Sequence, residues 1–231
     1  MWHIHTDNRV HPIQSATGRL YRKDNRTKKH SEIAAPSDYI TMTATDKVDM
    51  EEKVFTAIPW CRKLLDDPDF TLEPTGSRLS QPQSNLNTFP SRTLKTPDTI
   101  AGWCSLFRRP ETSPRNAKDE LRTLLALQQG LNGYIRVCHG GATATMFDEI
   151  MSILVFECRK SQRLDPNNVT ADLRIKYVKP VPTDAVVLVT AKIVDIQKGK
   201  KYFVKADMVD ERNVVLSTAE ALFIHIPMER L

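Results

Sequence analysis

The chain of 231 residues carries a formal net charge of +5, and 40% of its residues are hydrophobic, which allows one globular domain with a sizeable core. All of the net charge comes from residues 1–30, so the remainder is neutral overall and no nucleic-acid partner is expected. No apolar run approaches the ~18 residues that a membrane-spanning helix needs, so we expect no integral membrane segment.

Residues 1–50 are polar and basic and contain few large apolar residues, which predicts a disordered tail. A mitochondrial transit peptide is the alternative, because Arg and Ser are present, although Asp7 and Asp24 are unusual in such a peptide. We therefore expect a cytoplasmic location, with a mitochondrial one as the alternative.

The four cysteines predict free thiols in a reducing compartment, because their spacing shows neither a CxxC pair nor a disulfide framework. Cys138 adjoins His139, so a Cys–His nucleophile stays open as an alternative, although adjacency does not make two side chains face each other. No ligand spacing predicts a metal site, and no cofactor is expected.

Residues 51–98 predict a helical flap followed by a Pro-rich connection. A short helix is expected over Trp60–Asp67, after Pro59 and before Pro68. Glu73–Pro97 combines prolines with Ser, Asn, Gln and Thr, which is typical of a long irregular segment. It is either a mobile crossing segment or simply disordered.

Residues 99–231 predict an α+β domain in which a curved antiparallel sheet wraps around a long central helix. The last four predicted strands form a meander, with a hairpin turn at Gln197–Lys200. The predicted strands are Thr99–Arg108, Val169–Tyr177, Ala185–Ile196, Tyr202–Asp210 and Val214–Ile226, and a further helix is expected over Ala117–Gln129.

The stretch Arg136–Phe156 predicts the central helix, about 17 residues long, with apolar residues around most of its axis. Asp148 and Glu149 are the prominent exceptions. A carboxylate inside an apolar helix needs a partner or a function. We interpret Glu149 as structural or peripheral, and for Asp148 the alternative is a surface carboxylate on a less buried helix.

His139, Gly140 and Gly141 open this helix, where free backbone N–H groups could form an oxyanion hole or the glycines could simply serve a tight turn. Asp148 lies about 13 Å along the helix from His139, too far to act on the same atom. If there is a site, the spacing therefore predicts that two antiparallel copies of the helix share it in a dimer.

These residues resemble a known family. His139–Asp148 is similar to the HGG…D signature of hotdog-fold acyl-CoA thioesterases, in the branch of phenylacetyl-CoA thioesterases and thioesterase superfamily members. Thr170–Tyr177, followed by Lys179–Pro182, resembles the next strand of that branch, and Lys198–Phe203 resembles its hairpin. The resemblance covers about residues 93–227.

The resemblance implies a hydrolase of fatty acid metabolism that cleaves acyl-CoA thioesters in a homodimer or a dimer of dimers. Asp148 would be the general base or nucleophile, Gly140 the backbone donor to the thioester oxygen, supported by His139, and Thr170 the hydroxyl that positions water. Residues implied to contact CoA are Lys176, Val178, Lys200 and Lys205. Relatives often carry an Asn shortly before the His, and Asn132 lies near that position.

Other functions are less consistent with these residues. A non-catalytic acyl-CoA-binding dimer would need neither Asp148 nor Thr170. A hotdog dehydratase would require a His on the helix side, whereas His225 falls on the last predicted strand. A serine hydrolase would need a GxSxG elbow, which the sequence lacks.

Overall fold

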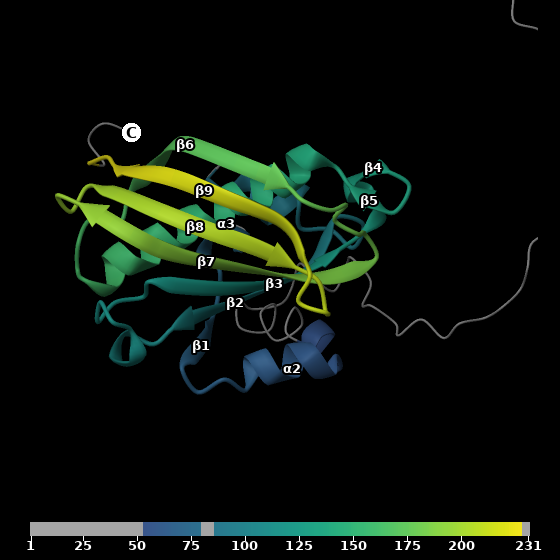
Figure 1. The fold of residues 1–231 in the computed structure, drawn as a ribbon, viewed down its shortest axis with the longest axis horizontal. Coiled ribbons are helices and arrows are strands. Elements are labelled where there is room, and N and C mark those ends of the chain that lie inside the picture. The colour runs from purple at the N-terminus through teal and green to yellow at the C-terminus, as the bar shows by residue number, and fades with distance from the viewer. Residues whose placement is uncertain (1–52, 80–85, 228–231) are drawn as a thin grey trace, which may run out of the picture.

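The computed structural model describes residues 53–79 and 86–227, and the predicted tail lies outside them. The described residues form an antiparallel sheet in the order β1-β2-β3-β7-β8-β9-β6 (Figure 1). Its strands are β1 (Phe70–Glu73), β2 (Ile100–Arg108), β3 (Glu120–Leu127), β6 (Asn168–Tyr177), β7 (Ala185–Gln197), β8 (Lys201–Val209) and β9 (Val215–His225). The other elements are α2 (Pro59–Leu65), α3 (Gly140–Ser161), the pair β4 (Asn132–Tyr134) and β5 (Val137–Cys138), and the short helices η2 (Gly76–Arg78), η3 (Phe89–Thr93), η4 (Pro110–Thr112) and η5 (Gln129–Leu131).

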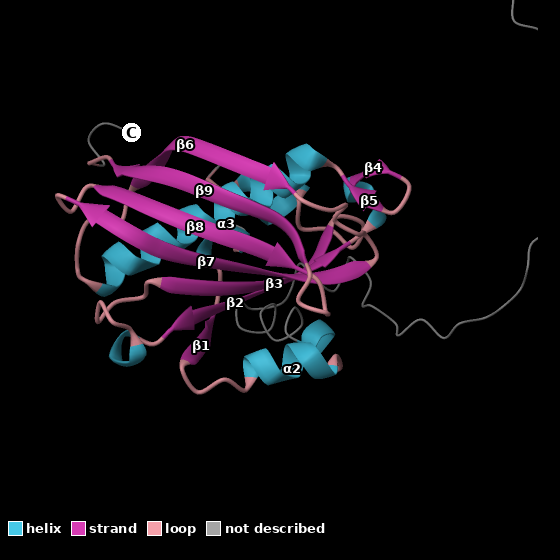
Figure 2. Ribbon diagram, viewed as in Figure 1, coloured by secondary structure: helices cyan, strands magenta, loops and turns pink. Residues whose placement is uncertain are grey.

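Helix α3 lies along one face of the sheet, which curves around it (Figure 2). Its side chains Phe147, Ile150 and Leu154 are fully buried against the inner face of the strands, in one cluster with Leu125 and Val189. Burying this apolar stripe is the main reason that the helix and the sheet stay together. The predicted α+β hotdog fold is confirmed.

The central helix differs from its prediction in two respects. It contains 22 residues and continues to Ser161, beyond the predicted end at Phe156. It is also buried mainly on the sheet side, because Phe156 and Lys160 are exposed and Asp148 is half-buried. The helix therefore keeps one face open in the single chain.

The predicted helix over Ala117–Gln129 is wrong, because Glu120–Leu127 forms strand β3. Leu121 and Leu125 pack toward α3, whereas Leu124 and Ala126 pack on the opposite face against α2 and its neighbours. A strand that is covered on both faces is apolar at nearly every position, and periodicity cannot distinguish it from a buried helix.

The predicted four-strand meander is also corrected. Strands β7, β8 and β9 follow one another as expected, and the turn between β7 and β8 has positive φ at Lys198 and Gly199, as a tight hairpin requires. Strand β6, however, pairs with β9 and not with β7. This places β6 at an edge of the sheet, with one side open to another strand.

The flap region contributes more to the sheet than the sequence indicates. The predicted short helix is confirmed as α2, and the four residues of β1 add a strand beside β2. Arg78, which is buried, donates to the carbonyl oxygens of Pro90 and Ile100 and so joins two parts of the Pro-rich connection to β2.

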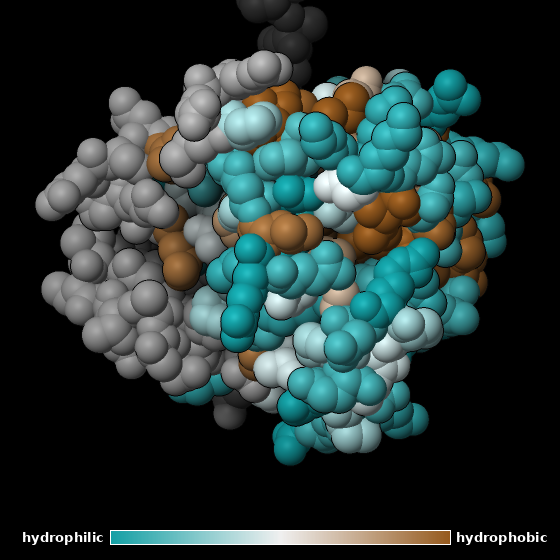
Figure 3. All heavy atoms as spheres, turned by 90° about the vertical axis from the view of Figure 1, so that its left-hand side faces the viewer, coloured by the Kyte–Doolittle hydropathy of each residue, from teal (hydrophilic) through white to brown (hydrophobic). Residues whose placement is uncertain are grey.

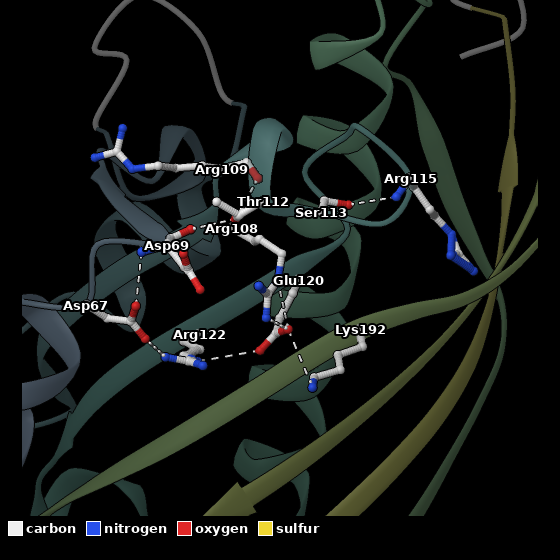
Figure 4. A network of polar contacts seen from close by, with 10 residues as sticks. All are labelled: Asp67, Asp69, Arg108, Arg109, Thr112, Ser113, Arg115, Glu120, Arg122 and Lys192. Carbon is white, nitrogen blue, oxygen red and sulfur yellow. Dashed lines mark hydrogen bonds and ion pairs between the residues drawn. The ribbon is translucent and has the colours of Figure 1, made fainter.

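A network of charged side chains fastens this region to strands β3 and β7 (Figure 4). Glu120 is only 5% exposed and accepts from Arg108 at 2.7 Å, with Lys192 at 3.4 Å. Arg122 pairs with Asp67 at 2.8 Å. A buried carboxylate among three cations is held in place by their combined charge.

Across the described ranges, no helix is both long and apolar enough to span a membrane.

Candidate active site

Asp148 and Thr170 meet on the open side of α3. The Thr170 hydroxyl donates a hydrogen bond to Asp148 Oδ1 at 2.7 Å. Asp148 is half-buried and Thr170 is exposed, so the second carboxylate oxygen remains available to a substrate or to water. A carboxylate that is oriented by a hydroxyl and open to solvent has the geometry of a general base.

A β-bulge aims Thr170 at the helix. The pairing of β6 with β9 shifts between Thr170 and Asp172, which leaves Ala171 as an extra residue. Ala171 is exposed and lies outside the regular alternation of the strand, in which every second side chain shares a face. Without the extra residue, Thr170 and Tyr177, seven positions apart, would point to opposite faces.

The Gly140 N–H is among the backbone donors that the first turn of α3 leaves free. His139 caps the helix, and its Nδ1 accepts from the Gly141 N–H at 2.9 Å. The Gly140 N–H has no hydrogen-bond partner within the described chain. Gly133 packs so closely on the histidine that a Cβ there would lie 3.0 Å from the Cα of His139. The predicted oxyanion donor is thus unoccupied by the protein's own groups.

A cavity of about 630 Å³ opens beside this helix end. Its floor includes His139 and Gly140, and its wall includes Tyr177, whose hydroxyl donates to the Gly140 carbonyl oxygen at 2.8 Å. Tyr134 lines the rim and is 82% exposed. The cavity joins apolar and aromatic surface to this helix end, and ligand-binding cavities commonly combine such surface with a few polar groups.

Within one chain, the carboxylate and the backbone donor are separate. Gly140 and Asp148 are eight residues apart on a continuous helix, which corresponds to about 12 Å. Groups that act on one carbonyl must both lie within about 3 Å of it. The structure therefore leaves the predicted need for a second copy in place.

Burial shifts the pKa of two other titratable groups near the helix. Burial raises the pKa of the Cys138 thiol, which weakens it as a nucleophile. Burial also raises the pKa of Glu149, and the neighbouring Asp148 carboxylate adds to this effect. Across the described ranges, no group of three or more His, Cys, Asp or Glu residues is placed to hold a metal ion.

The residues implied to contact CoA lie in two places. Lys176 and Val178 are exposed at the end of β6, and Val178 lines the cavity beside Gly140. Lys200 lies in the β7–β8 turn at the opposite end of the sheet, where the surface is mainly hydrophilic (Figure 3). Lys205 forms an exposed ion pair with Glu220 at 2.7 Å. One chain does not bring all four together.

Tyr177 and Gly133 were not identified from the sequence, because their roles depend on contacts across the fold. Asn132 Oδ1 accepts a hydrogen bond from the Thr183 hydroxyl at 2.6 Å. Asn132 itself lies on β4, opposite Cys138 of β5. Asn-Gly is a dipeptide typical of tight turns, so it could have indicated that the backbone at Gly133 lies close to His139.

The sequence model of the thioesterase superfamily matches residues 136–216, the segment that contains the helix end, Asp148 and Thr170. Residues 136–216 belong to the thioesterase superfamily. The acyl-coenzyme A thioesterase THEM4 of Mus musculus is 35% identical over 117 residues, which are 49% of this chain and 47% of that protein. Verlamelin biosynthesis protein B of Lecanicillium sp is 22% identical over 209 residues, 78% of this chain and 90% of that protein.

Among solved structures, the E. coli PaaI protein from the phenylacetic acid degradation operon matches with 15% identity and a TM-score of 0.41, over 47% of this chain and 73% of that chain. This chain spans about half the length of the mouse thioesterase that it matches. The family model covers the motif residues, and the resemblance found in the sequence is confirmed there.

Proposed function

We propose that this protein hydrolyses acyl-CoA thioesters to a free acid and CoA. The observation that carries the proposal is the 2.7 Å hydrogen bond between Thr170 and Asp148, on the exposed side of a helix whose N-terminus has a free backbone donor. A thioesterase superfamily segment, and relatives named as acyl-CoA thioesterases, support the same chemistry.

The reaction needs a base and a donor at one carbonyl. The thioester oxygen accepts from the Gly140 N–H, which stabilises the negative charge that develops on it. Asp148 takes a proton from water as the water oxygen bonds to the carbonyl carbon, and Thr170 holds the carboxylate in position. The C–S bond then breaks and CoA leaves as the thiolate, which takes up the proton.

The active site is shared by two copies of the chain. Strand β6 is an open edge of ten residues, and such an edge pairs readily with an identical strand. Antiparallel pairing of two β6 strands about a two-fold axis at Arg174, with Ala171 as the extra residue, sets Thr170 of one copy opposite Tyr177 of the other. Asp148 then approaches Gly140 of the second copy, in a homodimer or a dimer of dimers.

CoA lies at the edges of this shared site. Val178 lines the cavity beside Gly140, Lys176 is exposed near the end of β6, Lys200 lies in the β7–β8 turn, and Lys205 lies within β8. A lysine beside a phosphate supplies a charge-assisted hydrogen bond. Lys205 would have to leave Glu220 to do so.

The test is release of the CoA thiol from short, long and aromatic acyl-CoAs by the wild type and by Asp148→Asn. Turnover by the wild type, with a loss of at least about 100-fold in the variant, supports the assignment. Asp207→Asn, an exposed carboxylate on β8, is the matched control and should retain full turnover. Acyl-CoA binding without turnover in either protein would instead indicate a non-catalytic binding dimer, and unchanged turnover in Asp148→Asn would remove Asp148 from the mechanism.

A further inference from the structure

The peptide group between Gly140 and Gly141 is held from both ends by side chains. Its N–H donates to His139 Nδ1 at 2.9 Å, and its carbonyl oxygen accepts from the Tyr177 hydroxyl at 2.8 Å. The two contacts come from different parts of the chain, since His139 precedes the helix and Tyr177 ends strand β6.

This peptide needs such support because a glycine flanks it on each side. Glycine has no Cβ to restrict its backbone, so a peptide between two glycines reorients more easily than any other. The N–H of Gly140 belongs to the preceding peptide and shares the Gly140 Cα with this one. The His139 carbonyl oxygen of that preceding peptide accepts from the Thr143 N–H at 3.0 Å, so the direction of the Gly140 N–H depends on this bond as well as on the Gly140–Gly141 peptide.

The ring of Tyr177 is also in contact with this turn. A Cβ added at Gly140 would lie 3.5 Å from the Tyr177 Cζ, so the aromatic ring lies directly over the glycine. Tyr177 is 53% exposed, although its hydroxyl is satisfied by the backbone. A side chain placed only for packing would not need to remain half exposed at the wall of the cavity.

We infer that Tyr177 is a positioning residue for the oxyanion donor: with His139 it clamps the Gly140–Gly141 peptide so that the free N–H of Gly140 points into the cavity. This inference rests on the proposed thioester hydrolysis for its effect on rate. The clamp itself is a property of the chain alone. His139 contacts the nitrogen end and Tyr177 the oxygen end.

The test removes one oxygen atom, through Tyr177→Phe, which keeps the ring over Gly140. For hydrolysis, we expect kcat to fall about fivefold, the effect of one neutral hydrogen bond, with KM changed by less than about twofold. Exchange of the Gly141 amide hydrogen, followed by NMR, should become about fivefold faster, because its peptide loses one of the two side-chain contacts that hold it.

Two unreactive CoA compounds of the same chain length separate positioning from general damage. An S-(2-oxoalkyl)-CoA retains a carbonyl oxygen for the Gly140 N–H, whereas an S-alkyl-CoA thioether has none. Tyr177→Phe should weaken binding of the ketone about fivefold and leave binding of the thioether unchanged. Tyr202→Phe is the control. The Tyr202 hydroxyl accepts from Arg159 at the far end of α3, so the variant should have a lower melting temperature. It should not change the affinity for one compound relative to the other.

Equal binding losses for both compounds, or an unchanged exchange rate at Gly141, would overturn the inference. If the wild type hydrolyses no acyl-CoA, the proposed function fails, but the exchange rate of Gly141 still decides whether Tyr177 holds the peptide. If hydrolysis is confirmed and Tyr177→Phe keeps the full kcat, the function stands and the positioning role is rejected.

Discussion

Replacing Gly140 by proline would delete the proposed oxyanion donor with little other change. Gly140 is the first residue of α3, a position where proline is favoured because its fixed φ suits the helix and its N–H is not used. His139 has φ −61° and ψ 136°, the extended conformation that a residue before proline prefers. The main loss is therefore one backbone hydrogen-bond donor.

The expected effect follows from the value of such a donor. Removal of one oxyanion-hole donor lowers kcat by about 100- to 1000-fold, equivalent to about 3–4 kcal/mol. Gly140→Ala is the matched control, because it keeps the N–H and its Cβ would meet Tyr177 at an ordinary 3.5 Å. The alanine variant should retain most of the turnover, measured as release of CoA thiol.

Mixing two inactive variants then tests whether the site is shared. In a heterodimer of Gly140→Pro and Asp148→Asn, one of the two sites receives both intact residues, and the other receives neither. Random exchange of subunits yields heterodimers as half of all dimers, so about a quarter of the wild-type activity should return. If each site were built within one chain, every chain would carry a defect and no activity would return.

Two results would contradict these roles of Gly140 and Asp148. Full activity in Gly140→Pro would show that the Gly140 N–H is not the donor. A failure of the mixed variants to regain activity, although mass spectrometry shows that heterodimers have formed, would exclude the shared arrangement.

Three further predictions concern the same structure. Thr170→Val should lower kcat about 10- to 100-fold through loss of a hydrogen bond to a charged group, whereas Thr170→Ser should retain most of the activity in steady-state kinetics. Glu120→Gln should destabilise the fold by about 1.5–3 kcal/mol, because the part-buried Arg108 and Arg122 lose their carboxylate, and calorimetry should show a melting temperature lower by roughly 3–12 °C; an unchanged melting temperature would contradict this. Burial raises the pKa of Glu149, so the stability that its protonated form provides is lost as pH rises through the folded-state pKa. The melting temperature of Glu149→Gln should therefore lie above that of the wild type at about pH 8. This difference should disappear near pH 4.

The sequence predicted those elements whose pattern is set by one covered face. Strand β8 has buried Tyr202, Val204 and Ala206 alternating with less buried residues, and such alternation is visible without a structure. Strand β3 was mistaken for a helix because α2 covers its second face, and this cover comes from a region more than fifty residues earlier. The pairing of β6 with β9 was missed for a similar reason, since chain order does not fix which edge a strand joins.

The candidate site could be predicted where a local motif carries it. His139, Gly140 and Asp148 lie within ten residues and share a helix, so their spacing already indicates how they are placed. Tyr177 lies 37 positions from Gly140, and only the path of β6 across α3 brings the two into contact. Residues of this kind require the tertiary structure, because no sequence period relates them to the motif.

The single extra residue in β6 makes this chain unusually sensitive to changes in length. Deletion of Ala171 would restore regular alternation and turn Thr170 away from Asp148, while Tyr177 kept its place over Gly140. Substitutions at Ala171, whose side chain is exposed, should by contrast be tolerated. A comparison of natural or engineered variants should therefore find many residue types at position 171, but no shortening of the strand in any variant that remains active.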